Sequence, residues 1–298
     1  MATVGVLCAR GRVEEKALMA ALADAGIVSA LFPPADEPLP VGPLPVAPGG
    51  RPFPVPQIVV DRHPDRQVAR AVLTTCRALH VPALSAGIAA TGDRLDVASA
   101  LAAHGLPRPV TALCTSEEAG LAAVTALELP STLLPLDLKA RSIGMWDTDA
   151  AEAVLEHRAV LGGSVSSLGL IQAGAPAPHE LATVIVVDSA ATALDIAAGV
   201  SVPDGALRLA EEAARVLRAE LIAIEIAFAA TEPVVWDVRP VPEFRQAMPI
   251  RDITVAQAIA SAVEQRLAAT VLGQASDQHP DWSPLVHQGT HRDLVISA

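Results

Sequence analysis

The chain has 298 residues, enough for two or three lobes around a sizeable buried core. Apolar residues make up 51% of it and aromatic residues only 2%, so the core must be aliphatic. Lys and Arg number 21 against 33 Asp and Glu, a net charge of −12, which argues against the basic stripe that a nucleic-acid backbone requires.

The cysteine spacing and the lengths of the apolar runs indicate the cellular compartment of the protein. Cys8, Cys76 and Cys114 are far apart and lack C-x-x-C spacing, so neither a disulfide framework nor a zinc site is indicated. The first ten residues are too short and polar for a secretory signal, and no run of 18 or more apolar residues follows. We therefore expect a cytoplasmic protein without a membrane span and without a nucleic-acid partner.

Residues 1–85 predict a small parallel α/β lobe. A loop over residues 33–56 holds ten prolines and shows no helical or strand period. Gly26 is expected to end the first helix in the left-handed conformation. The strands expected are Val4–Cys8, Gln57–Asp61 and Val81–Leu84, and the helices are Glu14–Ala25 and Asp65–Leu79.

Residues 86–165 predict a second, small α+β segment. Ser116 and Thr148 are the expected N-caps of two of its helices, and Gly105 is expected to cap another at its C-terminus. The helices expected are Arg94–His104, Ser116–Leu127 and Thr148–Leu161, and the strands are Ala112–Cys114 and Ser131–Leu134.

Residues 166–272 predict a strand-rich third lobe, and residues 273–298 a loose extension that holds His279, His287 and His291. The spacing of these histidines does not match a helical metal pair. The strands expected are Leu168–Gln172, Ala182–Val187, Ala190–Ala198, Leu221–Phe228 and Val234–Val238, and the helices are Ala206–Ala219 and Ile253–Leu272.

Several stretches, in a characteristic order over about residues 1–270, carry a family resemblance. They are Val4–Leu7 with Arg12–Glu15, Gly92–Arg94, His104–Thr111, Asp149–Arg158 with Leu161–Gly163, Ile171–Gln172, and Asp237 through Glu243–Arg245. Together they resemble the ATP-grasp ligases of the LysX/RimK type, which join a carboxylate to an amine through an acyl phosphate. The resemblance implies an α/β ATP-grasp fold with an N-terminal parallel α/β lobe, a small α+β lid-bearing segment and a β-rich C-terminal lobe.

The resemblance also implies a nucleotide site, which this sequence keeps only in part. Where the relatives have two phosphate-binding lysines, this chain has Arg94 and Leu134. The glycine-rich phosphate loop corresponds to residues 138–142, which contain Lys139 and Arg141 but no glycine. The relatives have a Gln-Glu pair at the hinge strand. This chain has Gln172 at the first position of that pair and Ala173 in place of the Glu. The nucleotide-binding candidates are therefore Arg94, Lys139, Arg141 and Gln172.

The metal position keeps two carboxylates, Glu225 and Asp237, but Arg239 replaces the usual Asn. The two acids are candidate magnesium ligands, or they form an internal ion-pair cluster with Arg239 and Arg245. For Lys139 and Arg141, two cations in an irregular loop, the alternative is that they are simply solvated.

Arg10 and Arg12 follow the first strand, at the edge where α/β lobes commonly bind ligands. With Arg245 they are the candidate carboxylate-binding residues, and a surface salt bridge is the alternative for the first two.

Loss of about three phosphate contacts removes roughly 4–9 kcal/mol, and micromolar ATP binding amounts to only about 8 kcal/mol. The main hypothesis is therefore a LysX/RimK-like homologue with a decayed ATP and magnesium site, non-catalytic or dependent on a partner ligase. The alternative is a working ATP-dependent carboxylate–amine ligase with unusual phosphate-binding residues, for which ATP and Mg²⁺ would be the cofactors. A third hypothesis is that the chain is a binding protein for an amino acid or a dicarboxylate. A homo-oligomer, or a complex with a partner ligase or carrier protein, is expected.

Overall fold

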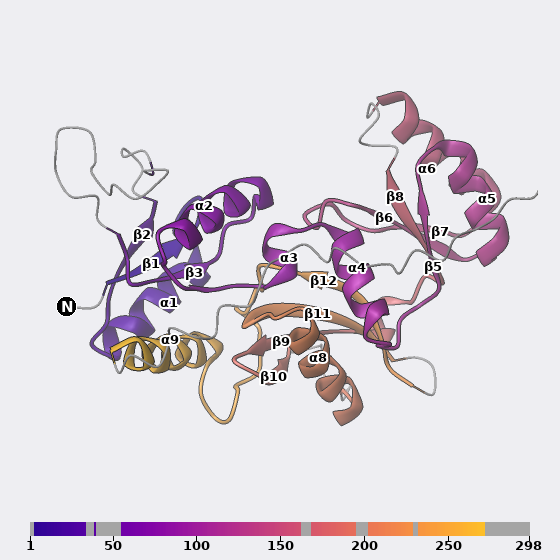
Figure 1. Ribbon diagram of the computed structural model, residues 1–298. Helices are drawn as coiled ribbons and strands as arrows, with labels where there is room; N and C mark the ends of the chain where they lie inside the picture. Colours follow the sequence, from indigo (N-terminus) through magenta and orange to yellow (C-terminus); the bar gives the residue numbers. More distant parts are fainter. Residues whose placement is uncertain are drawn as a thin grey trace, which may run out of the picture.

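The computed structural model describes residues 3–33, 39, 55–161, 168–194, 202–228 and 232–271. Most of the proline-rich stretch 33–56 and the whole tail 273–298, with its histidines, lie outside the described residues. Within the described part, the strands form three four-stranded sheets with helices packed on them (Figure 1).

The first sheet is parallel, as predicted for the N-terminal lobe, in the order β2-β1-β3-β4. Gly26 has φ +72° just after the first helix, which confirms the left-handed end. The elements are β1 (Thr3–Leu7), α1 (Val13–Asp24), β2 (Val28–Phe32), β3 (Ile58–Asp61), α2 (Arg66–Ala78) and β4 (Ala83–Leu84). Strand β2 was not predicted: it is the edge strand, and only its last residue is buried.

The second sheet is antiparallel, in the order β5-β8-β6-β7. Its elements are β5 (Thr111–Cys114), α5 (Glu117–Leu127), β6 (Ser131–Pro135), β7 (Ile143–Met145), α6 (Thr148–Leu161) and β8 (Gly169–Ala173). Helices α5 and α6 pack together, and their apolar residues form one cluster with those of the sheet. β8 follows the boundary expected near residue 165, yet it pairs with β5 and β6 in the middle of this sheet.

The helix ends of this segment confirm one cap and correct another. Ser116 accepts the backbone N–H of Ala119 and caps α5 as predicted. The prediction of Thr148 as N-cap of α6 was wrong, because the carboxylate of the preceding residue, Asp147, accepts the N–H of Ala150. Two helices precede the sheet, α3 (Ile88–Thr91), which was not predicted, and α4 (Arg94–Ala103), which ends at Gly105 with φ +68°.

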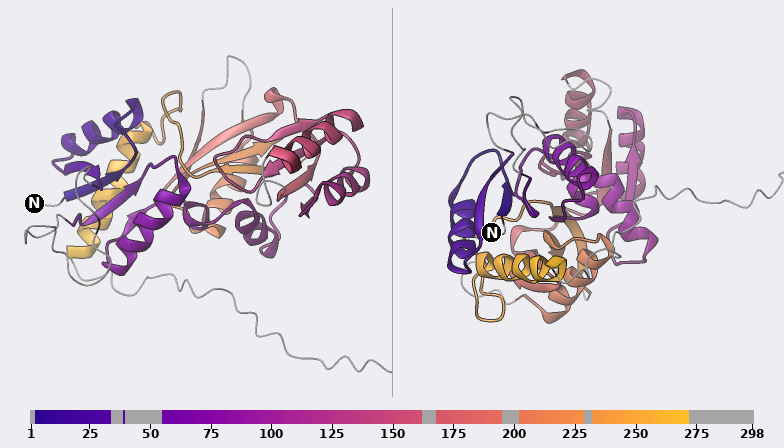
Figure 2. Two further views of the ribbon diagram at one scale, coloured as in Figure 1. Left: turned by 90° about the horizontal axis from the view of Figure 1, so that it is seen from above. Right: turned by 60° about the vertical axis from the view of Figure 1, so that its left-hand side comes forward.

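The third sheet is antiparallel, in the order β10-β9-β11-β12. Its elements are η1 (Pro178–Glu180), β9 (Leu181–Val187), β10 (Ala190–Ala193), α8 (Asp204–Val216), β11 (Leu221–Ala227), β12 (Val234–Arg239) and α9 (Val255–Val271). Helix α8 packs on this sheet, and α9 lies between it and α1 of the first lobe, as Figures 1 and 2 show.

Two aliphatic clusters join the first and third lobes. One of them packs Val4 and Leu18 of the first lobe with Ile185 of β9 and Ile259 of α9. The structure thus confirms the aliphatic core expected from the composition. None of the described helices is both long and apolar enough to cross a membrane.

Candidate functional site

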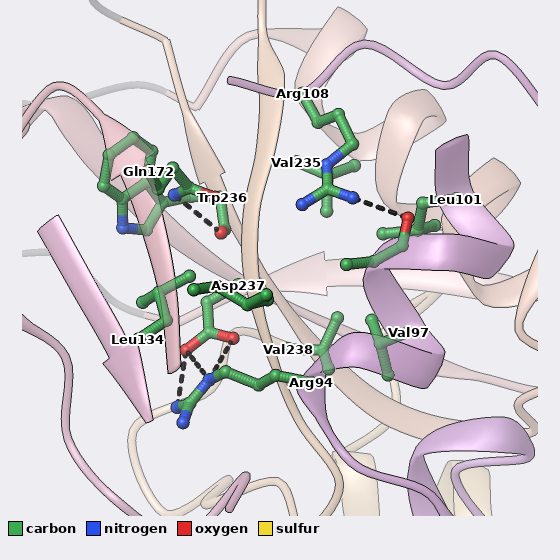
Figure 3. Close-up of a pocket in the computed structure, with 12 residues that line it drawn as sticks. Arg94, Val97, Leu101, Arg108, Leu134, Gln172, Val235, Trp236, Asp237 and Val238 are labelled. Carbon is green, nitrogen blue, oxygen red and sulfur yellow. Dashed lines mark hydrogen bonds and ion pairs between the residues drawn. The ribbon is translucent and has the colours of Figure 1, made fainter. Parts of the chain in front are cut away.

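The candidate site lies where the second sheet faces strand β12, with α4 along one side (Figure 3). Apolar side chains from all three elements line it, among them Leu134, Leu170 and Val235. The free space between them is about 20 Å³, room for one water molecule.

Arg94 enters this site from the first residue of α4. Asp93 caps the helix by accepting the N–H groups of Leu95 and Asp96, and this fixes the start of the helix beside β12. The Arg94 guanidinium is 5% exposed and forms an ion pair with Asp237 at 2.9 Å (Figure 3).

All five N–H bonds of the Arg94 guanidinium are used inside the protein. Nε donates to both Asp237 oxygens at 3.0 and 3.2 Å, and Nη2 donates to Asp237 and to the carbonyl of Ala140. Nη1 donates to the carbonyls of Pro135 and Asp137 at 2.5 and 2.6 Å. A phosphate would therefore have to displace a carboxylate or a carbonyl to reach this cation. The predicted nucleotide contact of Arg94 stays a prediction.

The segment between β6 and β7, residues 136–142, is hereafter the β6–β7 loop. Leu138 is buried in the large aliphatic cluster, while Lys139 and Arg141 are exposed. The backbone N–H of Val68 lowers the pKa of Asp65, and Lys139 adds to this lowering through its charge. The proposed phosphate contacts of Lys139 and Arg141 remain predictions.

Glu225 and Asp237 are opposite each other on β11 and β12, so their side chains share one face of the sheet. Arg239 pairs with Glu225, its Nε donating to Oε1 at 2.7 Å, while Asp237 pairs with Arg94. The expected ion-pair cluster therefore needs a correction, since Arg94 is the partner of Asp237. Arg245 is exposed, and no ion pair joins it to either acid.

Burial raises the pKa of Glu225; the Arg239 charge opposes this shift and the Asp237 charge adds to it. The described residues contain no group of three or more His, Cys, Asp or Glu side chains that could hold a metal ion. As they stand, the two carboxylates face guanidinium groups, so this donor set does not fit a divalent ion without rearrangement.

Gln172 connects the two sheets at this site. Its side chain is buried, and its Nε2 donates to the carbonyl of Trp236 at 3.2 Å (Figure 3). Its Oε1 accepts from the Thr111 hydroxyl at 3.4 Å. The residue predicted for nucleotide binding thus holds β8 against β12 in this structure.

A second charged cluster lies at the carboxyl ends of β1 and β3. Arg12 pairs with Glu15 in the first turn of α1, and Glu15 also pairs with Arg62, whose side chain is fully buried. Arg62 donates to the carbonyl of Pro242 and lies 4.8 Å from the centre of the Phe244 ring.

This cluster brings the segment that carries Arg245 to the N-terminal lobe. Arg10 is exposed, and neither it nor Arg245 has an acidic partner among the described residues. Glu15 and Arg62 were not among the predicted site residues. The run Asp61–Arg66, which holds four charged residues beginning at the last residue of a buried strand, was the signal that could have found Arg62.

No protein-family model matches the chain. A solved structure of a RimK domain ATP-grasp protein from Sphaerobacter thermophilus is similar, with a TM-score of 0.71 and 25% identity over 88% of this chain and 100% of that one. The ATP-grasp ligase PsnB, complexed with a minimal precursor, gives 0.65 and 14%, over 90% and 99%. A D-alanine–D-alanine ligase from Bacillus anthracis gives 0.62 and 12%, over 92% and 100%. The last two likenesses concern the fold alone.

Proposed function

This chain is a member of the ATP-grasp superfamily, and we propose that it is a LysX/RimK-like homologue whose ATP and magnesium site has decayed. It acts without catalysis of its own or together with a partner ligase. The observation that carries the proposal is the pairing of both remaining site acids with arginines of the same chain, Asp237 with Arg94 and Glu225 with Arg239.

The charge balance supports this proposal. In an ATP-grasp ligase a bound magnesium ion offsets the charge of the triphosphate and of its carboxylate ligands. Here two guanidinium groups already offset the two carboxylates. No Lys or Arg occurs between Gln172 and Asp204, the stretch in which the family resemblance implies phosphate-gripping arginines.

The energetic balance supports it as well. Removing Arg94 from Asp237 breaks a buried ion pair, which costs about 3–5 kcal/mol in proteins. A new charge-assisted hydrogen bond to phosphate returns roughly 1.5–3 kcal/mol. Arg94 is thus held more strongly by the protein than by a single phosphate contact.

Isothermal titration calorimetry of the purified chain with ATP and Mg²⁺ tests the proposal. We expect no saturable heat up to about 1 mM ATP, a concentration that corresponds to about 4 kcal/mol of binding. The double variant Arg94→Lys/Arg239→Asn removes the two guanidinium groups that pair with Asp237 and Glu225. We expect this variant to bind ATP with Mg²⁺ more tightly than the wild type. Saturable binding to the wild type below about 1 mM would refute the decayed site and favour a working ligase.

If the chain keeps a small ligand, we propose a carboxylate such as an amino acid or a dicarboxylate, held by Arg10, Arg12 and Arg245. Arg10 and Arg245 lack an acidic partner among the described residues, and the buried Arg62 contacts the segment that carries Arg245. A thermal shift with such acids and without nucleotide tests this role. The variant Arg10→Ala should abolish the shift, whereas the exposed Arg70→Ala on α2 should retain it.

A further inference from the structure

The acceptors around Arg94 form a cage for a planar cation. Three carbonyl oxygens of one short segment, from Pro135, Asp137 and Ala140, lie on one side, and the Asp237 carboxylate from β12 lies on the other. The backbone N–H of Arg94 adds a hydrogen bond of 2.9 Å to the carbonyl of Leu136. Arg94 therefore binds the last residue of β6 and three residues of the loop, and its ion pair with Asp237 joins them to the third sheet.

The sheet itself holds this loop only at its ends. The pairing of β6 with β7 stops at Leu133 and Ile143, and the pairing of β6 with β8 stops at Pro135. Inside the loop, Lys139 and Ala140 donate their N–H groups to Asp137. The buried Leu138, the partly buried Leu136 and the contacts from Arg94 connect the loop to the rest of the molecule.

We propose that Arg94 is a tethered cation that locks the β6–β7 loop against strand β12 beside the cleft, an autoinhibitory contact that keeps the candidate site shut. This deepens the proposed function and rests on it, because the cation that holds the loop is the one whose release the proposed function requires before a phosphate can bind. The guanidinium lies between Asp237 and the loop carbonyls, so the loop separates from β12 only when this cation leaves its cage.

The chemistry of the cage requires arginine. A guanidinium presents five N–H donors in one plane, and all five are used here, whereas a lysine ammonium has three donors and no planar fork. Lysine at position 94 would keep the charge beside Asp237 but would lose contacts to the loop carbonyls. The loop should therefore respond to the shape of the cation as well as to its charge.

Hydrogen–deuterium exchange of residues 136–142, followed by mass spectrometry, tests the lock. In Arg94→Ala we expect the loop amides to exchange about tenfold faster or more than in the wild type, because they now open locally. Guanidinium chloride at 50 mM should restore slow exchange by entering the empty cage, and 50 mM potassium chloride should not. The matched control Arg70→Ala, an exposed arginine on α2, should exchange like the wild type.

Unchanged loop exchange in Arg94→Ala, or rescue by both salts alike, overturns the lock. If Arg94→Ala does not fold, Arg94→Lys decides: faster loop exchange with wild-type exchange in β11 supports the lock, and wild-type exchange throughout overturns it. ATP binding by the wild type would refute the proposed function, whereas the exchange result would still report on the contact itself. The two failures are thus distinguishable.

Discussion

The buried ion pair between Glu15 and Arg62 allows a sharp test of the N-terminal lobe. The Oε1 atom of Glu15 lies 3.2 Å from Nη2 of Arg62, and both side chains are fully buried. Oε2 of the same carboxylate accepts the backbone N–H of Arg12 at 2.9 Å, at the start of α1. The variant Glu15→Gln keeps the shape of the side chain and removes the charge, so Arg62 remains buried without its counterion.

The expected cost follows from that geometry. Leaving one partner of a buried pair uncompensated costs about 3–5 kcal/mol, which lowers the Tm by about 6–20 °C at roughly 2–4 °C per kcal/mol for a chain of this size. Urea unfolding followed by circular dichroism measures the loss of unfolding free energy.

The matched control is Glu212→Gln, which removes an exposed pair with Arg215 whose side chains are 52% and 71% accessible. Its cost should stay below about 1 kcal/mol. If Glu15→Gln costs no more than this control, the buried cluster does not stabilise the lobe and the reasoning is wrong.

Three further predictions concern other parts of the fold. Gly87→Ala should destabilise the protein by more than about 2 kcal/mol, because φ is +58° and a Cβ would lie 2.0 Å from the Leu217 carbonyl oxygen; Gly26→Ala, with φ +72° and open space around it, should cost only about 1–2 kcal/mol by the same urea assay. Burial raises the pKa of Glu225, so the folded protein binds the carboxyl proton more tightly than the unfolded chain and loses stability as the pH rises above about 4.3. The unfolding free energy of Glu225→Gln should therefore increase relative to that of the wild type between pH 4 and pH 7. A difference in unfolding free energy that stays constant over this range would contradict the prediction. Burial raises the pKa of Cys76 to about 11, so about one thiol in a thousand is ionised at pH 8 and Cys76 should react with a thiol reagent only after unfolding, as peptide mapping of the labelled protein would show.

Local patterns predicted most helices and strands because each depends on a few neighbouring residues. Helix α6 spans Thr148–Leu161 as expected, and Ser116 caps α5 by a contact three residues away. Strand β2 escaped prediction because an exposed edge strand lacks the alternation of buried and exposed residues on which a strand assignment rests. Which sheet a strand joins is not a local property, and β8 therefore lies in the second sheet although it follows the boundary expected near residue 165.

The site was predictable by residue type but not by pairing. The sequence indicated Glu225, Asp237 and Arg94; the structure places Arg94 and Asp237 in the lining of one cleft and Glu225 opposite Asp237 on the neighbouring strand. The sequence did not predict the pairing of Arg94 with Asp237, because 143 residues separate the two. In the family resemblance Arg94 stands in place of a phosphate-binding lysine, so phosphate was the partner expected for it. The structure instead gives it a carboxylate and three carbonyls of the same chain.

The two arginines at the site explain how the fold remains stable without a ligand. Asp237 and Glu225 are only 9% and 11% exposed, and two buried carboxylates on one sheet face repel each other unless cations offset them. In a metal-bound site a divalent ion supplies two positive charges. Arg94 and Arg239 supply the same two charges from within the chain and, unlike an ion, cannot dissociate. The stability of the site should therefore not depend on magnesium, and the Tm of the wild type should be the same with Mg²⁺ as with a chelator. A rise of several degrees with Mg²⁺ would mean that the ion competes successfully with the guanidinium groups for these two acids.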